Sequence, residues 1–165
     1  MKINKKLRSS YPWKVRWTER AEEAGKFLAA DTSVIDLGGG MGEFHKQLRG
    51  KCYYLSLDRE PWTEYTQKCD FNKEKLPDYP PFQFIVCLGT IEYLEQPEQF
   101  LKDIKKYGDK LVVSYREKSN GGMDRKNNFE FAEFEKKIAE ADWEILANKK
   151  IKTSDRIYYC HRIKK

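Results

Sequence analysis

Two patterns of apolar residues alternate along this chain: short continuous runs, and residues at helical spacing. Short, largely apolar runs of four to six residues are typical of strands buried inside a sheet. Such runs occupy Val34–Leu37, Cys52–Leu57, Phe84–Leu88 and Lys110–Tyr115. A further short strand is expected near Gln67–Cys69. Strands that alternate with helical segments predict an α/β fold, with a mostly parallel sheet covered by helices on both faces.

Helical spacing of apolar residues marks the segments around these strands. The predicted helices cover residues 17–29, 42–48, 97–104 and 131–141. Thr18 is placed to cap the first helix, Gly50 to end the second, and Pro97 to open the third. Only 11 residues separate Asp58 from Asp70, which is too few for a full helix followed by a strand.

Two strands at the end of the chain, Trp143–Ile151 and Arg156–Ile163, predict a terminal β-hairpin around a Thr153-Ser154-Asp155 turn. The sheet is therefore expected to have seven strands, or six in a shortened form, with an antiparallel pair at its C-terminal end. We expect a single domain over residues 1–165, with residues 1–30 as an N-terminal helix and lid and residues 31–165 as the core.

Composition narrows the class of protein. A hydrophobic content of 39% suits a globular core, and no apolar run is long enough to cross a bilayer, so a cytoplasmic protein without membrane contact is expected. The four cysteines are scattered without a C-x-x-C pair, and the chain has two histidines. We therefore expect neither a metal site nor a disulfide scaffold.

The net charge of +6 has two interpretations. It could indicate an anionic partner such as nucleic acid. The basic residues, however, are spread over the chain in modest clusters and form no dense run. This spread favours a generally lysine-rich surface over a nucleic-acid interface.

A glycine-rich turn follows the first predicted strand. Asp36 ends the apolar run, Gly38, Gly40 and Gly42 follow at alternate positions, and Asp58 closes the second strand 22 residues after Asp36. Glycines allow positive φ angles and let a ligand approach the backbone, and open α/β sheets place a ribose-binding acid after the second strand. Residue 43 is Glu rather than the third glycine of a dinucleotide fingerprint, so the pattern predicts a nucleoside cofactor other than NAD.

The spacing Asp36-x-Gly38-x-Gly40-x-Gly42 resembles the first motif of the class I S-adenosylmethionine (SAM) dependent methyltransferases. Three more segments resemble later motifs of that superfamily. They are Cys69-Asp70-Phe71-Asn72 after the third strand, Phe84 to Pro97 with its Gly89-Thr90-Ile91-Glu92-Tyr93-Leu94 stretch, and Lys110-Leu111-Val112-Val113-Ser114-Tyr115 at the fifth strand. Within the superfamily, these segments resemble small bacterial methyltransferases of the methyltransferase-23-like and methionine-biosynthesis W-like groups.

The resemblance implies a Rossmann-like class I methyltransferase fold and a set of SAM contacts. Its cofactor-binding residues are Asp36, which braces the turn; Gly38, Gly40 and Gly42 at the methionine end; Asp58 on the ribose hydroxyls; Asp70 and the Phe71 N–H on adenine; Leu88 and Gly89 beside the sulfonium; and Ile91 over adenine. Asp70 could instead start a turn with Asn72, and Ile91 could be a core residue alone. The sequence departs from the family at Arg59, where an apolar residue often packs on adenine, and at Tyr93, where histidine is usual.

Candidate catalytic residues are expected at the C-terminal ends of the fourth and fifth strands, where open sheets bind ligands. The residues expected there are Glu92, Tyr93, Tyr115 and Arg116, and the first three are the catalytic candidates. Methyl transfer needs no metal and can depend on positioning alone, so a base is needed only where the acceptor keeps its proton. Glu92 could equally be an acid favoured at a helix start. Residues 118–128 and 11–17 are predicted to form a lid over the methyl donor.

The resemblance leaves three functions open. The first is SAM-dependent transfer of a methyl group to a small-molecule or sugar-type acceptor. The second is nucleic-acid methylation, which the sequence disfavours because amino methylases carry an Asp/Asn-Pro-Pro-aromatic motif after the fourth strand, where this chain has Leu88-Gly89-Thr90-Ile91. The third is a non-catalytic, SAM-binding regulatory module.

Overall fold

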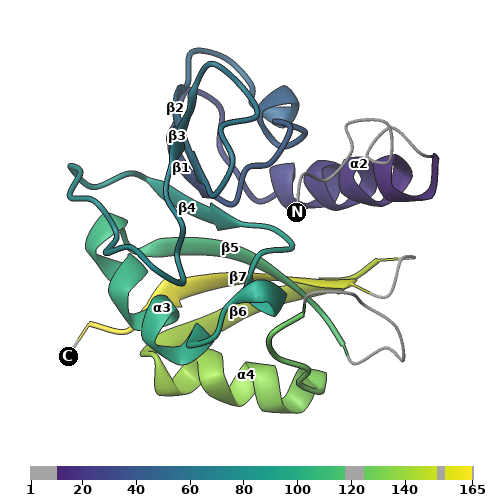
Figure 1. Cartoon of the computed structure of the whole chain (residues 1–165), viewed down its shortest axis with the longest axis vertical. Coiled ribbons are helices and arrows are strands. Elements are labelled where there is room, and N and C mark those ends of the chain that lie inside the picture. Colours follow the sequence, from purple (N-terminus) through teal and green to yellow (C-terminus); the bar gives the residue numbers. More distant parts are fainter. Residues whose placement is uncertain (1–10, 118–124, 152–154, 165) are drawn as a thin grey trace.

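The computed structural model describes residues 11–117, 125–151 and 155–164, with main chain alone for residues 11–15. Its centre is a seven-stranded sheet in the order β3-β2-β1-β4-β5-β7-β6 (Figure 1). The first five strands pair in parallel, whereas β7 pairs antiparallel with both β5 and β6. The strands are β1 (Ser33–Leu37), β2 (Tyr53–Asp58), β3 (Thr66–Lys68), β4 (Phe84–Cys87), β5 (Lys110–Arg116), β6 (Trp143–Lys150) and β7 (Asp155–Arg162).

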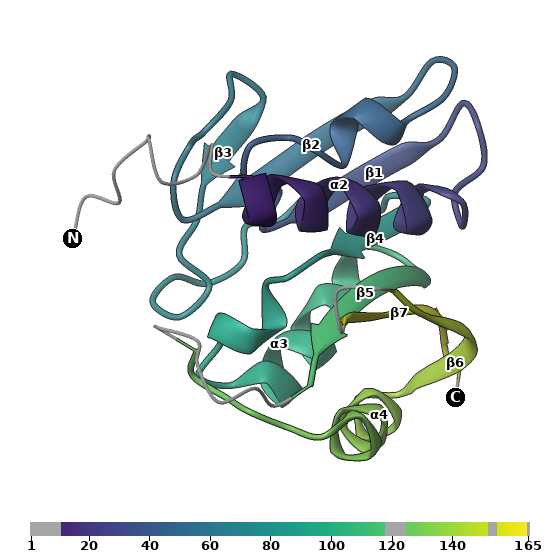
Figure 2. The same ribbon diagram turned by 90° about the vertical axis from the view of Figure 1, so that its right-hand side faces the viewer.

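Helices cover both faces of this sheet, as Figures 1 and 2 show. On one side lies α2 (Tyr11–Gly25), and on the other lie α3 (Pro97–Asp103) and α4 (Phe131–Glu140). Three short 3-10 turns complete the elements, namely η1 (His45–Gln47), η2 (Ile91–Tyr93) and η3 (Ile104–Tyr107). Local sequence explains two of the helix starts, because Pro97 stands at the first position of α3 and a Glu130–Glu133 capping box begins α4.

Alternate residues of the central strands enter two separate cores. Val34 and Val86 pack with Ala21 and Ala24 of α2 on one face. Ile35 and its counterparts on neighbouring strands pack with the apolar faces of α3 and α4 on the other. A parallel strand buried on both faces reads as a continuous apolar run, which is why the sequence located these strands well.

The seven-stranded α/β fold with its terminal hairpin is therefore confirmed, and so are the helices on both faces. The first helix begins at Tyr11 and ends at Gly25, so Thr18 lies inside it and does not cap it. Among the described residues, no helix has both the length and the apolar character needed to cross a membrane. The first part of the predicted lid loop, residues 118–124, lies outside the described residues, as do the side chains of residues 11–15 and the Thr153-Ser154 turn.

The helix predicted over residues 42–48 is wrong. The chain forms only the 3-10 turn η1 there, and Leu48 is already extended. Gly42 has a φ of +77°, which is incompatible with a right-handed helical start. The ring of His45 stacks on Tyr54 at 4.5 Å and lies against Tyr65 at 4.4 Å, so side-chain packing holds the turn together with its two 3-10 hydrogen bonds.

Candidate cofactor and active site

The order of the strands defines a crevice at the C-terminal edge of the sheet. β1 pairs with β2 on one side and with β4 on the other, so the chain leaves β1 and β4 in opposite directions. The glycine turn follows β1, and Gly89 lies two residues beyond the end of β4. Ligands of open α/β sheets bind at such a switch point.

Two glycines of the turn have opposite surroundings. A Cβ atom on Gly38 would overlap the side chain of Thr90, so this glycine allows β1 and the segment after β4 to approach closely. A Cβ atom on Gly40 would meet nothing within 4 Å, and Gly40 has a φ of +52°. Gly40 therefore presents bare backbone to open space at the edge of the sheet, whereas Gly38 is required by packing.

Asp58 lies at the rim of this open space. One of its carboxylate oxygens accepts a hydrogen bond from the Gly40 N–H at 2.9 Å, and the other accepts one from the Glu60 N–H at 3.0 Å. These bonds fix the direction of the half-buried carboxylate. Each oxygen keeps a further lone pair, so the pair can still accept hydrogen bonds from a diol.

Asp36 lies below the glycine turn rather than in the open space. It is 1% exposed, and its carboxylate accepts a 2.6 Å hydrogen bond from the Tyr54 hydroxyl. Burial raises the pKa of Asp36 to about 7, and the nearby charge of Asp58 adds to this, while the Tyr54 hydrogen bond and the Arg20 charge oppose it. The role of Asp36 in bracing the turn stays a prediction.

The segment after β3 is organised by side-chain bonds to its own backbone. Asp70 accepts a hydrogen bond from the Asn72 N–H at 3.1 Å, which is the local turn that the sequence left open as an alternative. Asn72 in turn joins this segment to the one after β4, because it accepts from the Glu95 N–H and donates to the Tyr93 carbonyl, each at 2.9 Å. Phe71 packs against Phe100 of α3 at 5.2 Å.

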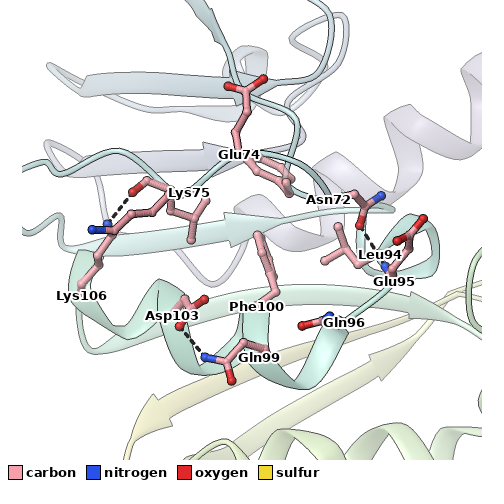
Figure 3. Close-up of a pocket in the computed structure, with 12 residues that line it drawn as sticks. Asn72, Glu74, Lys75, Leu94, Glu95, Gln96, Gln99, Phe100, Asp103 and Lys106 are labelled. Atoms are coloured by element: carbon pink, nitrogen blue, oxygen red, sulfur yellow. Dashed lines mark hydrogen bonds between the residues drawn. The ribbon is translucent and has the colours of Figure 1, made fainter.

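A cavity of about 340 Å³ lies between this segment and α3. Figure 3 shows Phe100 rising into its centre, with Asn72 and Glu95 at one end and Lys106 at the other. Of the predicted cofactor residues, Phe71 alone lines this cavity. The cavity therefore does not include the glycine turn.

The three predicted residues after β4 differ in their surroundings. Leu88 and Gly89 are half-buried, and the Gly89 N–H donates to Ser114 Oγ at 2.8 Å. Ile91 is fully buried in the core beneath α3 and α4. Leu88 and Gly89 thus lie at the open edge of the sheet, while a contact between Ile91 and adenine stays a prediction.

Glu92 is the candidate catalytic residue with an unusual environment. It is 5% exposed, and its Oε1 accepts a hydrogen bond from the Arg116 N–H at 2.9 Å. Its Oε2 is buried and has no hydrogen-bond partner within the described chain. Burial raises the pKa of the Glu92 carboxyl, although the charge of Arg20 opposes the shift.

The other two candidate catalytic residues differ from Glu92. Tyr93 is 45% exposed. Tyr115 is fully buried, stacks on Phe134 at 4.3 Å, and uses its hydroxyl to donate to Asn127 Oδ1 and to accept from the Phe129 N–H. These contacts make Tyr115 an anchor for the segment before α4, and a catalytic role for it stays a prediction.

Sequence reasoning named Arg116 at this edge but missed Arg20 and Asp155, and with them the ion-pair cluster that the three residues form. Asp155, at the start of β7, is fully buried and pairs with Arg20 of α2 at 3.3 Å and Arg116 of β5 at 2.9 Å. The Arg20 guanidinium lies directly over Gly89, where a Cβ atom would overlap it. Because 135 residues separate Arg20 from Asp155, no local spacing in the sequence could indicate this pair.

Comparison with known proteins finds relatives by structure alone. No family model matches the chain, and no curated protein sequence matches it. The protein that binds the Trm112 methyltransferase activator in Haloferax volcanii is similar at a TM-score of 0.75 and 14% identity, over 92% of each chain. A SAM-dependent methyltransferase from Aquifex aeolicus is similar at 0.72 and 18% identity, over 96% of each chain.

A third similar structure is the magnesium protoporphyrin IX methyltransferase of Synechocystis with bound S-adenosylhomocysteine (SAH). It has a TM-score of 0.72 and 13% identity, over 98% of this chain and 89% of that one. At identities this low, the similarity shows a shared backbone fold and does not show that the side chains of the site are shared. The chain has the Rossmann-like fold of the class I SAM-dependent methyltransferases.

Proposed function

We propose that this protein is a SAM-dependent methyltransferase that acts on a small-molecule acceptor. The observation that carries the proposal is the bare backbone of Gly40, which faces open space while its N–H is held by Asp58. An acid and an uncovered glycine at the switch point of the sheet fit a nucleoside with a short charged tail. The shared fold with methyltransferases supports the same conclusion.

The residues at the edge of the sheet fit SAM in a definite order. Asp58 would accept from the ribose hydroxyls, Gly38 and Gly40 would line the methionine end, and the Phe71 N–H with Asp70 would meet adenine. Arg20 joins this set, because its guanidinium lies over Gly89 and suits the methionine carboxylate. When bound, SAM would supply an electrophilic methyl group on a sulfonium.

The protein's own part in the reaction is positioning and proton transfer. Glu92 Oε2 has no partner in the described chain and lies in a buried site, so it would accept a hydrogen bond from the acceptor group. The raised pKa of Glu92 brings the carboxylate closer to the range in which a general base works. Glu92 would then take the proton that the acceptor releases, while the walls of the crevice orient the two molecules.

A small-molecule acceptor is favoured over nucleic acid. The segment after β4 reads Leu88-Gly89-Thr90-Ile91 and lacks the motif that holds a flipped base. The similar protein from Synechocystis is named for a porphyrin substrate. We also propose, from its sequence motifs, that the chain is related to the small bacterial methyltransferase-23-like and methionine-biosynthesis W-like groups. We further propose that it acts in the cytoplasm.

Replacing Asp58 tests the proposed cofactor site. Asp58→Ala removes the charged acceptor of the ribose hydroxyls and should weaken SAH binding roughly 10- to 1,000-fold, measured by calorimetry. Asp103→Ala, which removes an exposed carboxylate from α3, serves as the matched control and should bind SAH normally. Unchanged SAH affinity in a folded Asp58→Ala protein would contradict the assignment of Asp58.

A further inference from the structure

Two arginines share one buried carboxylate at the C-terminal edge of the sheet. Arg116 Nε donates to Asp155 Oδ1 at 2.9 Å, and Arg20 Nη1 donates to Asp155 Oδ2 at 3.3 Å. The three residues come from β5, α2 and β7, and Asp155 is fully buried. The guanidinium groups of Arg116 and Arg20 are therefore held on the two oxygens of the same carboxylate, and the Arg20 guanidinium also covers Gly89.

Arg116 is held from several sides and yet keeps its outer edge open. Its backbone N–H donates to Glu92 Oε1 at 2.9 Å, and its carbonyl accepts from Arg125 Nη2 at 2.5 Å. In the part of the chain that the structure describes, its side chain bonds through Nε alone, and the side chain is 21% exposed. Nη1 and Nη2 thus form a fixed fork of donors that matches a carboxylate or phosphate.

The charges around Arg116 do not balance. Arg125 lies over the Tyr115 ring at 5.7 Å and spends its terminal nitrogens on the backbone carbonyls of residues 116 and 117, so no described acid neutralises it. Asp155 is shared between Arg116 and Arg20, so among the described residues no carboxylate is paired with Arg125 or with Nη1 and Nη2 of Arg116.

We propose that the methyl acceptor carries an anionic group, a carboxylate or a phosphate, that binds to the Nη1–Nη2 edge of Arg116. This inference rests on the proposed methyltransferase function and adds the chemical class of the acceptor. Glu92 Oε1 is bound to the Arg116 backbone N–H, so the two residues are neighbours at this edge of the sheet; the partnerless Glu92 Oε2 is covered in this structure, and a turn of its side chain would be needed for it to meet an acceptor anchored on Arg116. Arg116 would act as a specificity-determining residue and Glu92 as the base.

Inorganic phosphate, titrated into the protein saturated with SAH, is a direct probe of this site. SAH occupies any cofactor carboxylate site beforehand, so phosphate reports the acceptor side alone. We expect one phosphate to bind with millimolar affinity at low ionic strength, followed by calorimetry and by the ¹⁵N resonances of the arginine side chains. Arg116→Gln should weaken phosphate binding at least tenfold while SAH affinity is retained.

Two further variants make the outcome unambiguous. Arg116→Lys keeps the charge beside Asp155 but lacks the planar pair of donors, so it should also lose most of the phosphate affinity. This variant provides the test if Arg116→Gln fails to fold. Lys136→Gln removes one exposed charge from α4 and should leave phosphate binding unchanged. If phosphate fails to bind the SAH complex, or binds the Arg116→Lys protein as well as the wild type, the inference is overturned. If SAH itself fails to bind the wild-type protein, the proposed methyltransferase function is contradicted, and the inference that rests on it is contradicted as well.

Discussion

At the scale of single residues, two glycines of one turn have different proposed roles, with Gly38 needed for packing and Gly40 for ligand binding. A Cβ atom at Gly38 would overlap Thr90, while a Cβ atom at Gly40 would enter open space. Gly40→Ala should therefore cost only the strain of a positive φ, about 1–2 kcal/mol, yet should weaken SAH binding strongly because the methyl group occupies ligand space. Gly38→Ala should lower the free energy of unfolding considerably more.

Urea unfolding and SAH titration of the two variants provide the check. We expect Gly40→Ala to show the larger loss of SAH affinity and Gly38→Ala the larger loss of unfolding free energy. A Gly40→Ala protein that binds SAH like the wild type would place the ligand elsewhere.

Asp36 predicts a pH dependence of stability. Its pKa is raised to about 7 in the folded protein from 3.8, so the folded state holds a proton that the unfolded state has released. Its contribution is fully present below pH 4 and is lost as the pH rises through 7. Asp36→Asn should therefore flatten the fall in unfolding free energy between pH 5 and pH 8.

Glu92, whose pKa is also raised by burial, should leave a part of that slope in the Asp36→Asn protein. The measurement is a series of urea titrations across this pH range. A slope identical to that of the wild type would show that Asp36 is ionised in the folded protein throughout this range.

The candidate site shows which residue roles a sequence can reveal. The glycine turn and Asp58 were found because both lie a fixed number of residues from a strand end, and strand ends set their place in the fold. Arg20, Arg116 and Asp155 were not found as a group, since they meet through tertiary structure alone. Ile91 and Tyr115 lie near the strand ends where the sequence placed them, but the packing of α3 and α4 buries both, which no local pattern indicates.

At the scale of elements, the buried strands were the most predictable and the segment after the glycine turn the least. Continuous apolar runs identified β1, β2, β4 and β5 within two residues, because strands covered on both faces allow few polar positions. The segment from Gly42 to Leu48 has helical spacing of apolar residues but is fixed by a positive φ and by aromatic stacking on His45. Those tertiary contacts override local propensity.

The helix α2 brings a cation to the edge of the sheet, and this gives it a proposed part in cofactor binding. Arg20→Met should weaken SAH binding about tenfold or more, because a charge-assisted hydrogen bond to the methionine carboxylate is lost. Decarboxylated SAH should bind the variant and the wild type alike.

Lys26→Met, just beyond the end of α2, removes an exposed charge and is the matched control. Equal loss of affinity for SAH and for its decarboxylated analogue would contradict a carboxylate contact and would indicate instead that Arg20 supports the fold through Asp155.

At the scale of the whole molecule, the order of the strands brings the separate pieces of the site to one edge. The glycine turn after β1, Asp58 at the end of β2, Gly89 after β4, and the start of β7 all meet there, although more than a hundred residues separate the first from the last. Two cores, one on each face of the sheet, hold this edge in place. The architecture therefore explains how a short chain can present backbone, carboxylate and guanidinium groups to one ligand.

Calorimetric titration of the purified protein with SAH, and separately with NAD, tests whether the glycine turn and Asp58 bind SAM. We expect one SAH site per chain with an affinity on the order of micromolar or tighter, and no heat from NAD, because Glu43 stands where a dinucleotide site needs glycine. Binding of NAD without any response to SAH would contradict this expectation.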